Sequence, residues 1–362
     1  MLKRGIDIIN ETRETLNNLQ SGIIRPITTG DEELDKMCLG GLLPGTVVAI
    51  IARSTHGKTH ELELLQRHIA VHEPDVIILQ CNWELEVLKL VTREVAVTTG
   101  KTLQEVITKK PEGEVLNKLE KVFDRFKKAN MYFQEKPPSA KEFAEDIRWL
   151  YQHFSDRRIL ITIDNLENCL NTENNQKLTM DKMLQTINFL KKEHFFSAWV
   201  ILNQANNELV KRIQDPKQHR PDESCIYGTD QLYKLADVVQ FKVIPYKMGV
   251  ADKYMVFGKE RYDHLKEFKL PSAGATTSFD PVGNVFRFYL KHRRVGEKNV
   301  PDLFIESMYT RESVGMAPAG KIAEPKLPST KKKTPSTPMV ITAVETLPLN
   351  TLNSSTSQGE GF

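Results

Sequence analysis

One short segment constrains what this chain can fold into more than any other: residues 52–59 read Ala-Arg-Ser-Thr-His-Gly-Lys-Thr. A β-rich run, Thr46–Ala52, precedes this segment, and apolar residues at helical spacing, from Leu62 to Ile69, follow it. A strand, a tight turn and a helix in that order form a phosphate-binding loop, in which backbone N–H groups and a helix N-terminus face phosphate oxygens. The segment therefore predicts a nucleotide-binding α/β protein.

Individual side chains of this loop predict how the phosphates are held. Lys58 would place a full positive charge on the β- and γ-phosphates, and Thr59 would offer its hydroxyl to Mg²⁺. The general loop pattern begins with glycine where this chain has Ala52, whose side chain is small enough if its φ stays negative. The loop residues that we expect to contact the nucleotide are Ser54, Thr55, His56, Gly57, Lys58 and Thr59.

Beyond the loop, strand-like and helix-like segments alternate, which predicts an α/β fold with a mostly parallel sheet covered on both faces. The expected strands are Val76–Cys81, Ile159–Ile163, Trp199–Asn203 and Asp237–Val243. The expected helices are Glu61–His72, Glu84–Val97, Gly113–Ala129, Leu178–Lys192 and one that begins after Ser139 as its N-cap. Three later runs without intervening helices predict antiparallel strands at the sheet edge: Tyr254–Phe257, Val285–Leu290 and Leu303–Glu306.

The two ends of the chain differ from this pattern. Residues 1–22 predict a helix with a narrow apolar stripe, which either meets a partner surface or packs on its own domain. Residues 23–312 contain the alternating segments and form the predicted nucleotide-binding domain. Residues 313–362 are rich in Pro, Ser, Thr and Lys, and this composition predicts a disordered tail.

The overall composition narrows the classes of function. With 50 basic against 47 acidic residues, the net charge is only +3, which excludes a protein surface that is basic all round. Any contact with nucleic acid must therefore come from local clusters of basic residues. Four scattered cysteines without C-x-x-C spacing argue against a disulfide framework and a zinc site, and they suit a reducing cytoplasm. The charged start lacks a signal-peptide pattern, and no apolar run approaches about 18 residues, so we expect no membrane span.

Polar residues at three predicted strand ends fit the same nucleotide site. Asp164 ends an apolar strand, where a carboxylate would hold the Mg²⁺ shell; the alternative is a surface residue that caps a turn. Glu84 follows another strand, where it would orient or deprotonate the attacking water; the alternative is a carboxylate that stabilises a helix N-terminus. Gln204 ends a third strand, where its amide would bond the γ-phosphate, unless it merely caps the strand.

A cluster of basic residues follows Gln204, and we expect the segment that carries it to form a loop. A loop joined to a γ-phosphate sensor would couple hydrolysis to the grip on a nucleic-acid strand, because loop cations neutralise phosphates without reading the base sequence. On charge alone, a solvated loop explains the cluster equally well. The cations are Lys211, Arg212, Lys217, His219 and Arg220.

Together these motifs resemble the RecA-type core, and within it the C-terminal motor domain of DnaB-type replicative helicases. Residues 52–59 resemble that family's A-R-P-S-M-G-K-T, which also begins with alanine. Its S-L-E-M block resembles Asn82–Leu85, which assigns the catalytic glutamate to Glu84, and a family arginine then falls on Arg93, at the nucleotide. The family's I-D-Y-L and S-Q-L-N blocks resemble Ile163–Leu166 and Asn203–Asn206.

A later block resembles the loop with which this family grips single-stranded DNA. The likeness covers Arg220-Pro221 and Gly228–Asp237, and Tyr227 stands where the family often has arginine. The resemblance therefore implies nucleic-acid contacts, which together with the basic cluster we expect at Lys211, Arg212, Arg220, Tyr227, Gly228 and Thr229.

The last matching block is Lys291–Arg294, which resembles the family's K-x-R-N-G. In DnaB-type rings this motif supplies a lysine and an arginine finger to the γ-phosphate bound by the neighbouring subunit, where an arginine neutralises charge that develops during transfer. The resemblance implies these roles for Lys291 and Arg293. Because the motif's glycine is displaced to Gly296, Arg294 is a rival for the finger.

The family resemblance implies an ATP-dependent, ring-forming replicative DNA helicase, with ATP and Mg²⁺ as cofactors. It further implies single-stranded DNA, other copies of this chain in a hexamer, and a primase or loader as partners, in the cytoplasm of a bacterium or an infected cell. The chain begins near the family's linker helix, so we expect a collarless, phage-like form. Two alternatives remain: a RecA-like recombinase that forms filaments, and a non-catalytic nucleotide-binding scaffold that regulates a helicase.

Overall fold

The computed structural model describes residues 4–215, 220–250, 254–257, 276–279, 284–294 and 303–307. The chain divides into two units, Met1–Ala317 and Pro318–Phe362, and the described residues all belong to the first. The expected tail at 313–362 and the cations Lys217 and His219 lie outside the described residues.

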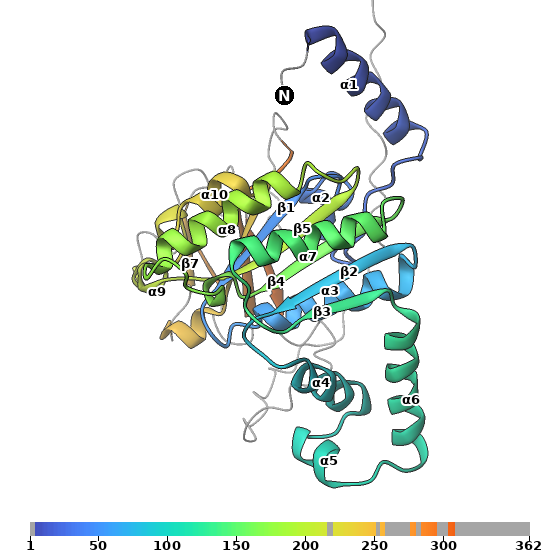
Figure 1. Ribbon diagram of the computed structural model, residues 1–362. Helices are drawn as coiled ribbons and strands as arrows, with labels where there is room; N and C mark the ends of the chain where they lie inside the picture. Colours follow the sequence, from blue (N-terminus) through green and yellow to red (C-terminus); the bar gives the residue numbers. More distant parts are fainter. Residues whose placement is uncertain are drawn as a thin grey trace, which may run out of the picture. The chain divides into compact units, whose positions relative to one another are not determined.

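A twisted sheet forms the centre of the first unit (Figure 1). Eight strands of the described chain are hydrogen-bonded in the order β10-β9-β6-β1-β5-β4-β2-β3. Strands β1 to β6 run parallel to one another, whereas β9 pairs antiparallel with β6 and β10 pairs antiparallel with β9. The predicted mostly parallel sheet with antiparallel edge strands is therefore confirmed. The strands are β1 (Val47–Ala52), β2 (Val76–Asn82), β3 (Met131–Gln134), β4 (Arg158–Asp164), β5 (Ser197–Gln204), β6 (Val238–Val243), β9 (Asn284–Lys291) and β10 (Leu303–Ser307).

The segment Tyr254–Phe257 differs from the prediction. We expected it at the edge of the main sheet, but as β7 it pairs antiparallel with β8 (Thr276–Phe279) in a separate two-stranded sheet. The position beside β6 is taken by β9, and the next position is taken by β10. The sequence pattern showed that the segment is extended, but it could not show which strand would be its partner.

Helices cover both faces of the sheet, and the alternation of side chains along β1 shows how (Figure 1). Val47, Ala49 and Ile51 pack with apolar residues of α7, α8 and α9 on one face. Val48 and Ile50 pack with residues of α2 and α3 on the other. Because β1 is buried on both faces, its sequence is continuously apolar. The helices are α1 (Gly5–Gln20), α2 (Glu32–Met37), α3 (Lys58–His72), α4 (Val87–Thr99), α5 (Leu103–Thr108), α6 (Gly113–Lys128), α7 (Ala140–His153), α8 (Gln176–Leu190), α9 (Asn207–Gln214) and α10 (Gln231–Leu235), with short 3₁₀ turns η1 (Leu166–Asn168), η2 (Glu223–Cys225) and η3 (Pro245–Met248).

Two predictions near the site differ from the structure: the helix expected at Glu84–Val97 is present as α4 but starts later, and a segment expected as a loop is helical. The expected helix from Glu84 begins only at Val87, where the Glu135 side chain accepts a hydrogen bond from the Val87 N–H at 2.9 Å. The segment after Gln204, expected as a loop, contains α9. Asn206 caps α9 by accepting from the Glu208 N–H, and buried apolar side chains four residues apart anchor the helix to the core.

The predicted N-terminal helix is present as α1, but no residue of α1 is buried. Its apolar stripe includes Ile6, Ile9 and Leu16, each about half exposed. In the part of the chain that the structure describes, this stripe therefore stays about half exposed. Within the described residues, none of the helices is both long enough and apolar enough to cross a membrane.

Candidate nucleotide-binding site

The carboxyl end of the sheet brings the predicted phosphate loop together with neighbouring strand ends. Ala52, the last residue of β1, pairs with Gln204 of β5 on one side and with Lys242 of β6 on the other. The chain then turns sharply and enters α3 at Lys58. Gly57 has a φ of +81°, a left-handed conformation that glycine adopts without strain, so the loop can close tightly before the helix.

Lys58 is buried at the mouth of this loop. Its ammonium donates a hydrogen bond to the Ala52 carbonyl at 2.9 Å, across the loop. Burial lowers the pKa of Lys58, while the charges of Asp164 and Glu84 oppose the shift. A buried ammonium whose charged form is disfavoured gains from a nearby polyanion, so this position suits phosphate binding.

Asp164 and Thr59 lie side by side beneath the loop. Asp164 ends β4, is 3% exposed, and forms a side-chain hydrogen bond with Thr59. Burial raises the pKa of Asp164 to about 6, and the Thr59 hydrogen bond opposes the shift. Its Oδ1 atom has no hydrogen-bond partner among the described residues. The alternative of a surface residue that caps a turn is therefore wrong for Asp164.

Glu84 lies in the bend between β2 and α4 and is exposed. The bend is fixed by its neighbour, because the Trp83 N–H donates to the Asp164 carbonyl at 2.8 Å. The charge of Glu84 raises the pKa values of both Asp164 and Lys58, which places its carboxylate within electrostatic reach of the loop. Because α4 begins three residues later, Glu84 is not an N-terminal residue of that helix.

Arg93 projects from α4 toward the same cluster. Its charge lowers the pKa values of Asp164 and of Glu63, a buried carboxyl on α3. Burial, the larger effect, raises the pKa of Glu63 to about 7. No sequence signal marks Glu63, because its position on α3 resembles that of any other helical glutamate.

Gln204 contacts the phosphate loop directly. Its side-chain amide donates to the Ser54 hydroxyl at 3.1 Å, and the Arg53 guanidinium donates to the carbonyl of Ala205 at 3.2 Å. Two hydrogen bonds therefore connect the loop to the end of β5 and the segment that follows it.

Lys291 and Arg293 lie at the opposite, amino end of the sheet. The Lys291 ammonium donates to the Tyr233 carbonyl at 3.1 Å, and Arg293 donates to the Thr46 hydroxyl at 2.6 Å. Thr46 immediately precedes β1, whereas the phosphate loop follows it. The fold thus separates these two residues from the phosphate loop of their own chain.

The predicted nucleic-acid residues fall into two groups. Lys211 lies on α9, and Arg212 is held by a hydrogen bond to the Arg220 carbonyl and an ion pair with Asp222.

The second group follows β5. Tyr227 is 42% exposed, and its backbone is tied to β5 because its N–H donates to the Gln204 carbonyl. Gly228 has a φ of +82°, and a Cβ there would meet Met180 Sδ at 2.6 Å. Thr229 is buried, and its hydroxyl bonds to Asp181. Gly228 and Thr229 therefore shape the turn that presents Tyr227.

A family model from known proteins covers most of these site residues. The family model described as the DnaB-like helicase C terminal domain matches residues 26–281, a range that includes the phosphate loop, Glu84, Asp164 and Gln204 but ends before Lys291. Among curated proteins, no sequence match was found.

Two solved structures share the fold. One, described as a DnaB-like replicative helicase and its interactions with primase, has a TM-score of 0.60 and 16% identity, covering 85% of this chain and 66% of that chain. The ATPase domain of G40P has a TM-score of 0.61 and 16% identity, covering 84% of this chain and 95% of that chain. This chain thus spans slightly less than two thirds of the first structure and nearly all of the second.

Proposed function

Because the chain belongs to the family of DnaB-like helicase C-terminal domains, we propose that it is an ATP-dependent, ring-forming replicative helicase that moves along single-stranded DNA and unwinds duplex DNA. The observation that supports this best is the meeting of Lys58, Asp164 and Gln204 at one sheet edge, around a single loop. Such a helicase works on a genome, so its place is the cytoplasm of a bacterium or an infected cell.

The residues of the site fit ATP and Mg²⁺. Lys58 would exchange the Ala52 carbonyl for the β- and γ-phosphates, because a charged partner is stronger than a neutral one. The unpartnered Oδ1 of Asp164 and the adjacent Thr59 hydroxyl are the hard oxygen atoms that Mg²⁺ prefers, with the phosphates supplying further oxygens. Bound Mg²⁺ would neutralise charge on the phosphates during hydrolysis.

The remaining residues have roles around the γ-phosphate. Glu84 is exposed beside Lys58 and would orient the attacking water, and Arg93 would hold negative charge near Asp164. Gln204 would sense the γ-phosphate through Ser54 and pass its loss to the turn that presents Tyr227.

The position of Lys291 and Arg293 supports an assembly of several copies, which we propose to be a ring. Since both lie at the sheet end away from their own phosphate loop, their action on a γ-phosphate requires a second copy of the chain. The exposed stripe of α1 offers an apolar surface for that neighbour. Tyr227, with Lys211, Arg212 and Arg220, would contact the DNA strand, and a primase or loader completes the proposed partners.

The test is ATP hydrolysis with and without single-stranded DNA. We expect DNA-stimulated turnover in the wild type and a loss of roughly 10²–10³-fold in Lys58→Ala. Lys182→Ala, which removes an exposed lysine on α8, is the matched control and should hydrolyse ATP normally. Robust DNA-stimulated turnover by Lys58→Ala would refute the assignment of the site.

The same protein preparation separates the two alternatives. With Mg²⁺, a non-hydrolysable ATP analogue and single-stranded DNA, a helicase should form closed rings of about six copies, as DnaB-type proteins do. Open filaments would indicate the recombinase instead. A single copy without turnover would indicate the regulatory scaffold.

A further inference from the structure

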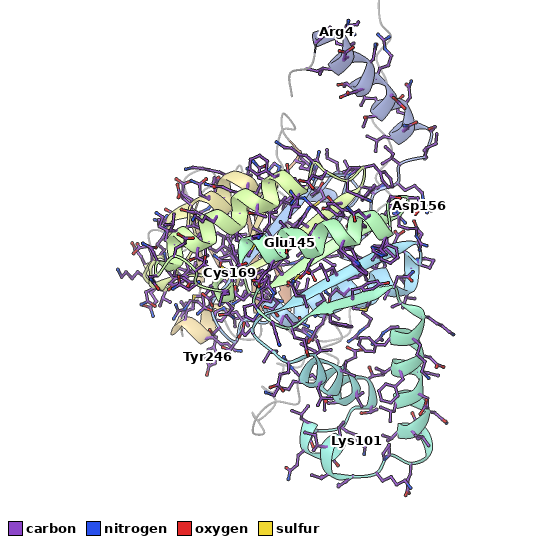
Figure 2. All side chains as sticks on the ribbon, in the orientation of Figure 1. Arg4, Lys101, Glu145, Asp156, Cys169 and Tyr246 are labelled. Carbon is purple, nitrogen blue, oxygen red and sulfur yellow. The ribbon has the colours of Figure 1, made fainter. Side chains whose placement is uncertain are left out.

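Three contacts hold the phosphate loop from the side of β6. The Lys247 ammonium donates to the Thr55 carbonyl at 2.7 Å, and the Ile244 N–H donates to Nδ1 of His56 at 3.1 Å. The Lys242 ammonium donates to the Gly57 carbonyl at 3.3 Å. Three successive loop residues are therefore bound by one segment, Lys242–Lys247, which we call the loop clamp. The exposed side chain of Tyr246, labelled in Figure 2, marks its position.

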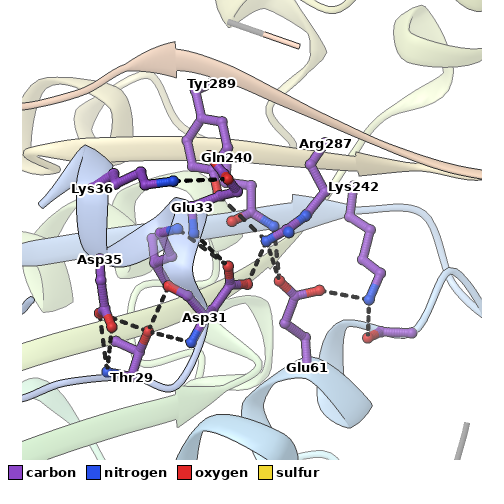
Figure 3. Close-up of polar contacts among 12 residues, drawn as sticks. Thr29, Asp31, Glu33, Asp35, Lys36, Glu61, Gln240, Lys242, Arg287 and Tyr289 are labelled. Atoms are coloured by element: carbon purple, nitrogen blue, oxygen red, sulfur yellow. Dashed lines mark hydrogen bonds and ion pairs between the residues drawn. The ribbon is translucent and has the colours of Figure 1, made fainter. Parts of the chain in front are cut away.

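A buried ion network fixes the inner end of this clamp (Figure 3). Lys242 and Glu61 are both buried, and the ammonium donates to Oε2 of Glu61 at 2.5 Å. The other oxygen of Glu61 accepts from the Gln240 amide at 3.0 Å and lies 3.8 Å from the guanidinium of Arg287. Arg287, which is 1% exposed, also bonds to Asp31. Because every charge in this network has a partner, the ammonium of Lys242 is held in one place.

The clamp acts on carbonyl groups, and this determines where the loop's N–H groups point. In a trans peptide the C=O and the following N–H point in opposite directions. Lys247 draws the Thr55 carbonyl outward, so the N–H of His56 points across the loop, where it donates to the Arg53 carbonyl at 3.2 Å. The Gly57 carbonyl accepts from the Glu61 N–H at 3.1 Å as well as from the Lys242 ammonium, so it points along α3 and the N–H of Lys58 points back toward the loop.

The clamp also concentrates positive charge at the loop. His56 is buried among cations: burial lowers its pKa to about 4, and the charges of Lys247, Lys58, Arg53 and Lys242 add to the effect. The ring of His56 therefore stays neutral at neutral pH, which leaves its Nδ1 able to accept the Ile244 N–H. Loop N–H groups and cations together form a fixed anion site.

We propose that Lys242 and Lys247 are positioning residues for the triphosphate, and that the loop clamp presets the backbone N–H groups of the phosphate loop before nucleotide arrives. This inference rests on the proposed function, because it requires the loop to bind a nucleotide. Because the clamp acts through the phosphate loop, it should strengthen the binding of any ligand with the same phosphates.

The test is the dissociation constant of a fluorescent non-hydrolysable ATP analogue with Mg²⁺. We expect Lys242→Met and Lys247→Met each to weaken binding about tenfold, the usual effect of removing one charged hydrogen bond. Inorganic triphosphate, used as a competitor, should lose affinity by the same factor. Lys247→Arg retains a charged donor and should restore binding to within about twofold of the wild type.

Two control variants separate positioning from folding. Arg158→Met breaks a buried ion pair with Glu73 at the amino end of the sheet, so it should lower thermal stability without changing nucleotide affinity. Lys182→Met removes an exposed lysine on α8 and should change neither. Lys247 is itself exposed, so Lys247→Met folds and decides the question even if Lys242→Met does not.

The outcomes distinguish the clamp from the proposed function. If the wild type binds the analogue and either folded clamp variant binds it equally well, the clamp is refuted and the proposed function is unaffected. If the wild type does not bind the analogue at all, the proposed function fails and the clamp fails with it.

Discussion

At each end of the sheet a buried cation is paired with carboxylates, but the two ion networks contact different parts of the chain. At the amino end, Arg158 bonds to Glu73 and Asp75, and it also donates to the carbonyl of Pro26, which leads into the core. At the carboxyl end, Lys242 bonds to Glu61 and to the Gly57 carbonyl of the phosphate loop. The first network fixes a segment of the fold, and the second fixes a loop that must receive a ligand.

The pKa shifts at the amino end favour the charged forms. Hydrogen bonds from Arg158 lower the pKa of Asp75, and they lower that of Glu73 although burial opposes the shift. The pKa of Arg158 is raised, since its hydrogen bonds to both carboxylates exceed the effect of burial. A group whose charged form is favoured in the folded state contributes to stability.

The shifts at the carboxyl end have the opposite sense. Burial raises the pKa values of Asp164 and Glu63 and lowers that of Lys58, so each charged form is disfavoured in the folded protein. Charged groups that are buried in this way lower the stability of the ligand-free protein. Clusters of such groups are typical of functional sites. The carboxylates that bond to Arg158 therefore stabilise the folded state, whereas Lys58, Glu63 and Asp164 have the shifts that are typical of a binding site.

The variant with the largest expected effect tests whether Arg293, at the amino end of the sheet, takes part in ATP hydrolysis. Arg293→Ala should lower ATP turnover by about 10³-fold, because it removes the proposed arginine finger. Lys58→Ala should be equally inactive. If the finger acts on a neighbouring copy, an equimolar mixture of the two variants should regain turnover, since each supplies what the other lacks.

The rival residue provides the control for this experiment. Arg294→Ala should retain turnover if Arg293 is the finger, and the roles are reversed if Arg294→Ala is the inactive variant. Two inactive variants whose mixture stays inactive would show that these residues do not act between copies, and the contrast between the sheet ends would then be purely structural.

The next effect concerns stability at the amino end. Arg158→Met leaves two carboxylates without their partner, and we expect the free energy of unfolding to fall by about 3–5 kcal/mol, measured by denaturant titration. The effect should depend on pH. Because the pKa of Glu73 in the folded protein is lowered from 4.5, its contribution is fully present above pH 4.5 and is lost as the pH falls further, through the lowered pKa. The destabilisation should therefore shrink as the pH falls below 4.5; a difference that grows in acid would contradict the ion pair.

The smallest effect has the opposite sign and concerns the carboxyl end. Burial raises the pKa of Asp164 from 3.8 to about 6, so ionised Asp164 destabilises the folded protein above that pH. Asp164→Asn removes the charge and should stabilise the ligand-free protein at pH 7 by about 1–3 kcal/mol while preventing Mg²⁺-dependent turnover. Thermal unfolding at pH 7 measures this, and a destabilised variant would contradict the comparison.

Local sequence signals predicted the residues that depend on one strand and the turn after it. The loop at 52–59, Asp164 at the end of β4 and Gln204 at the end of β5 were all placed correctly at the carboxyl edge, because parallel strands all end at the same edge. The local signals did not predict secondary structure that depends on contacts with distant parts of the chain. The helix after Glu84 starts late because Glu135 caps it, and the segment after Gln204 is helical because α9 packs on the core.

Patterns within a few residues predicted most of the alternating strands and helices, the phosphate loop and the carboxylates that follow apolar strands, but not α9 or β8. Folding is what brings Lys242 into contact with Gly57, and Lys247 into contact with Thr55, nearly 200 residues earlier in the chain. Nothing in the spacing of Lys242 within its strand indicates this contact. It exists because β6 pairs with β1, and strand pairing is a long-range choice that the whole core makes together.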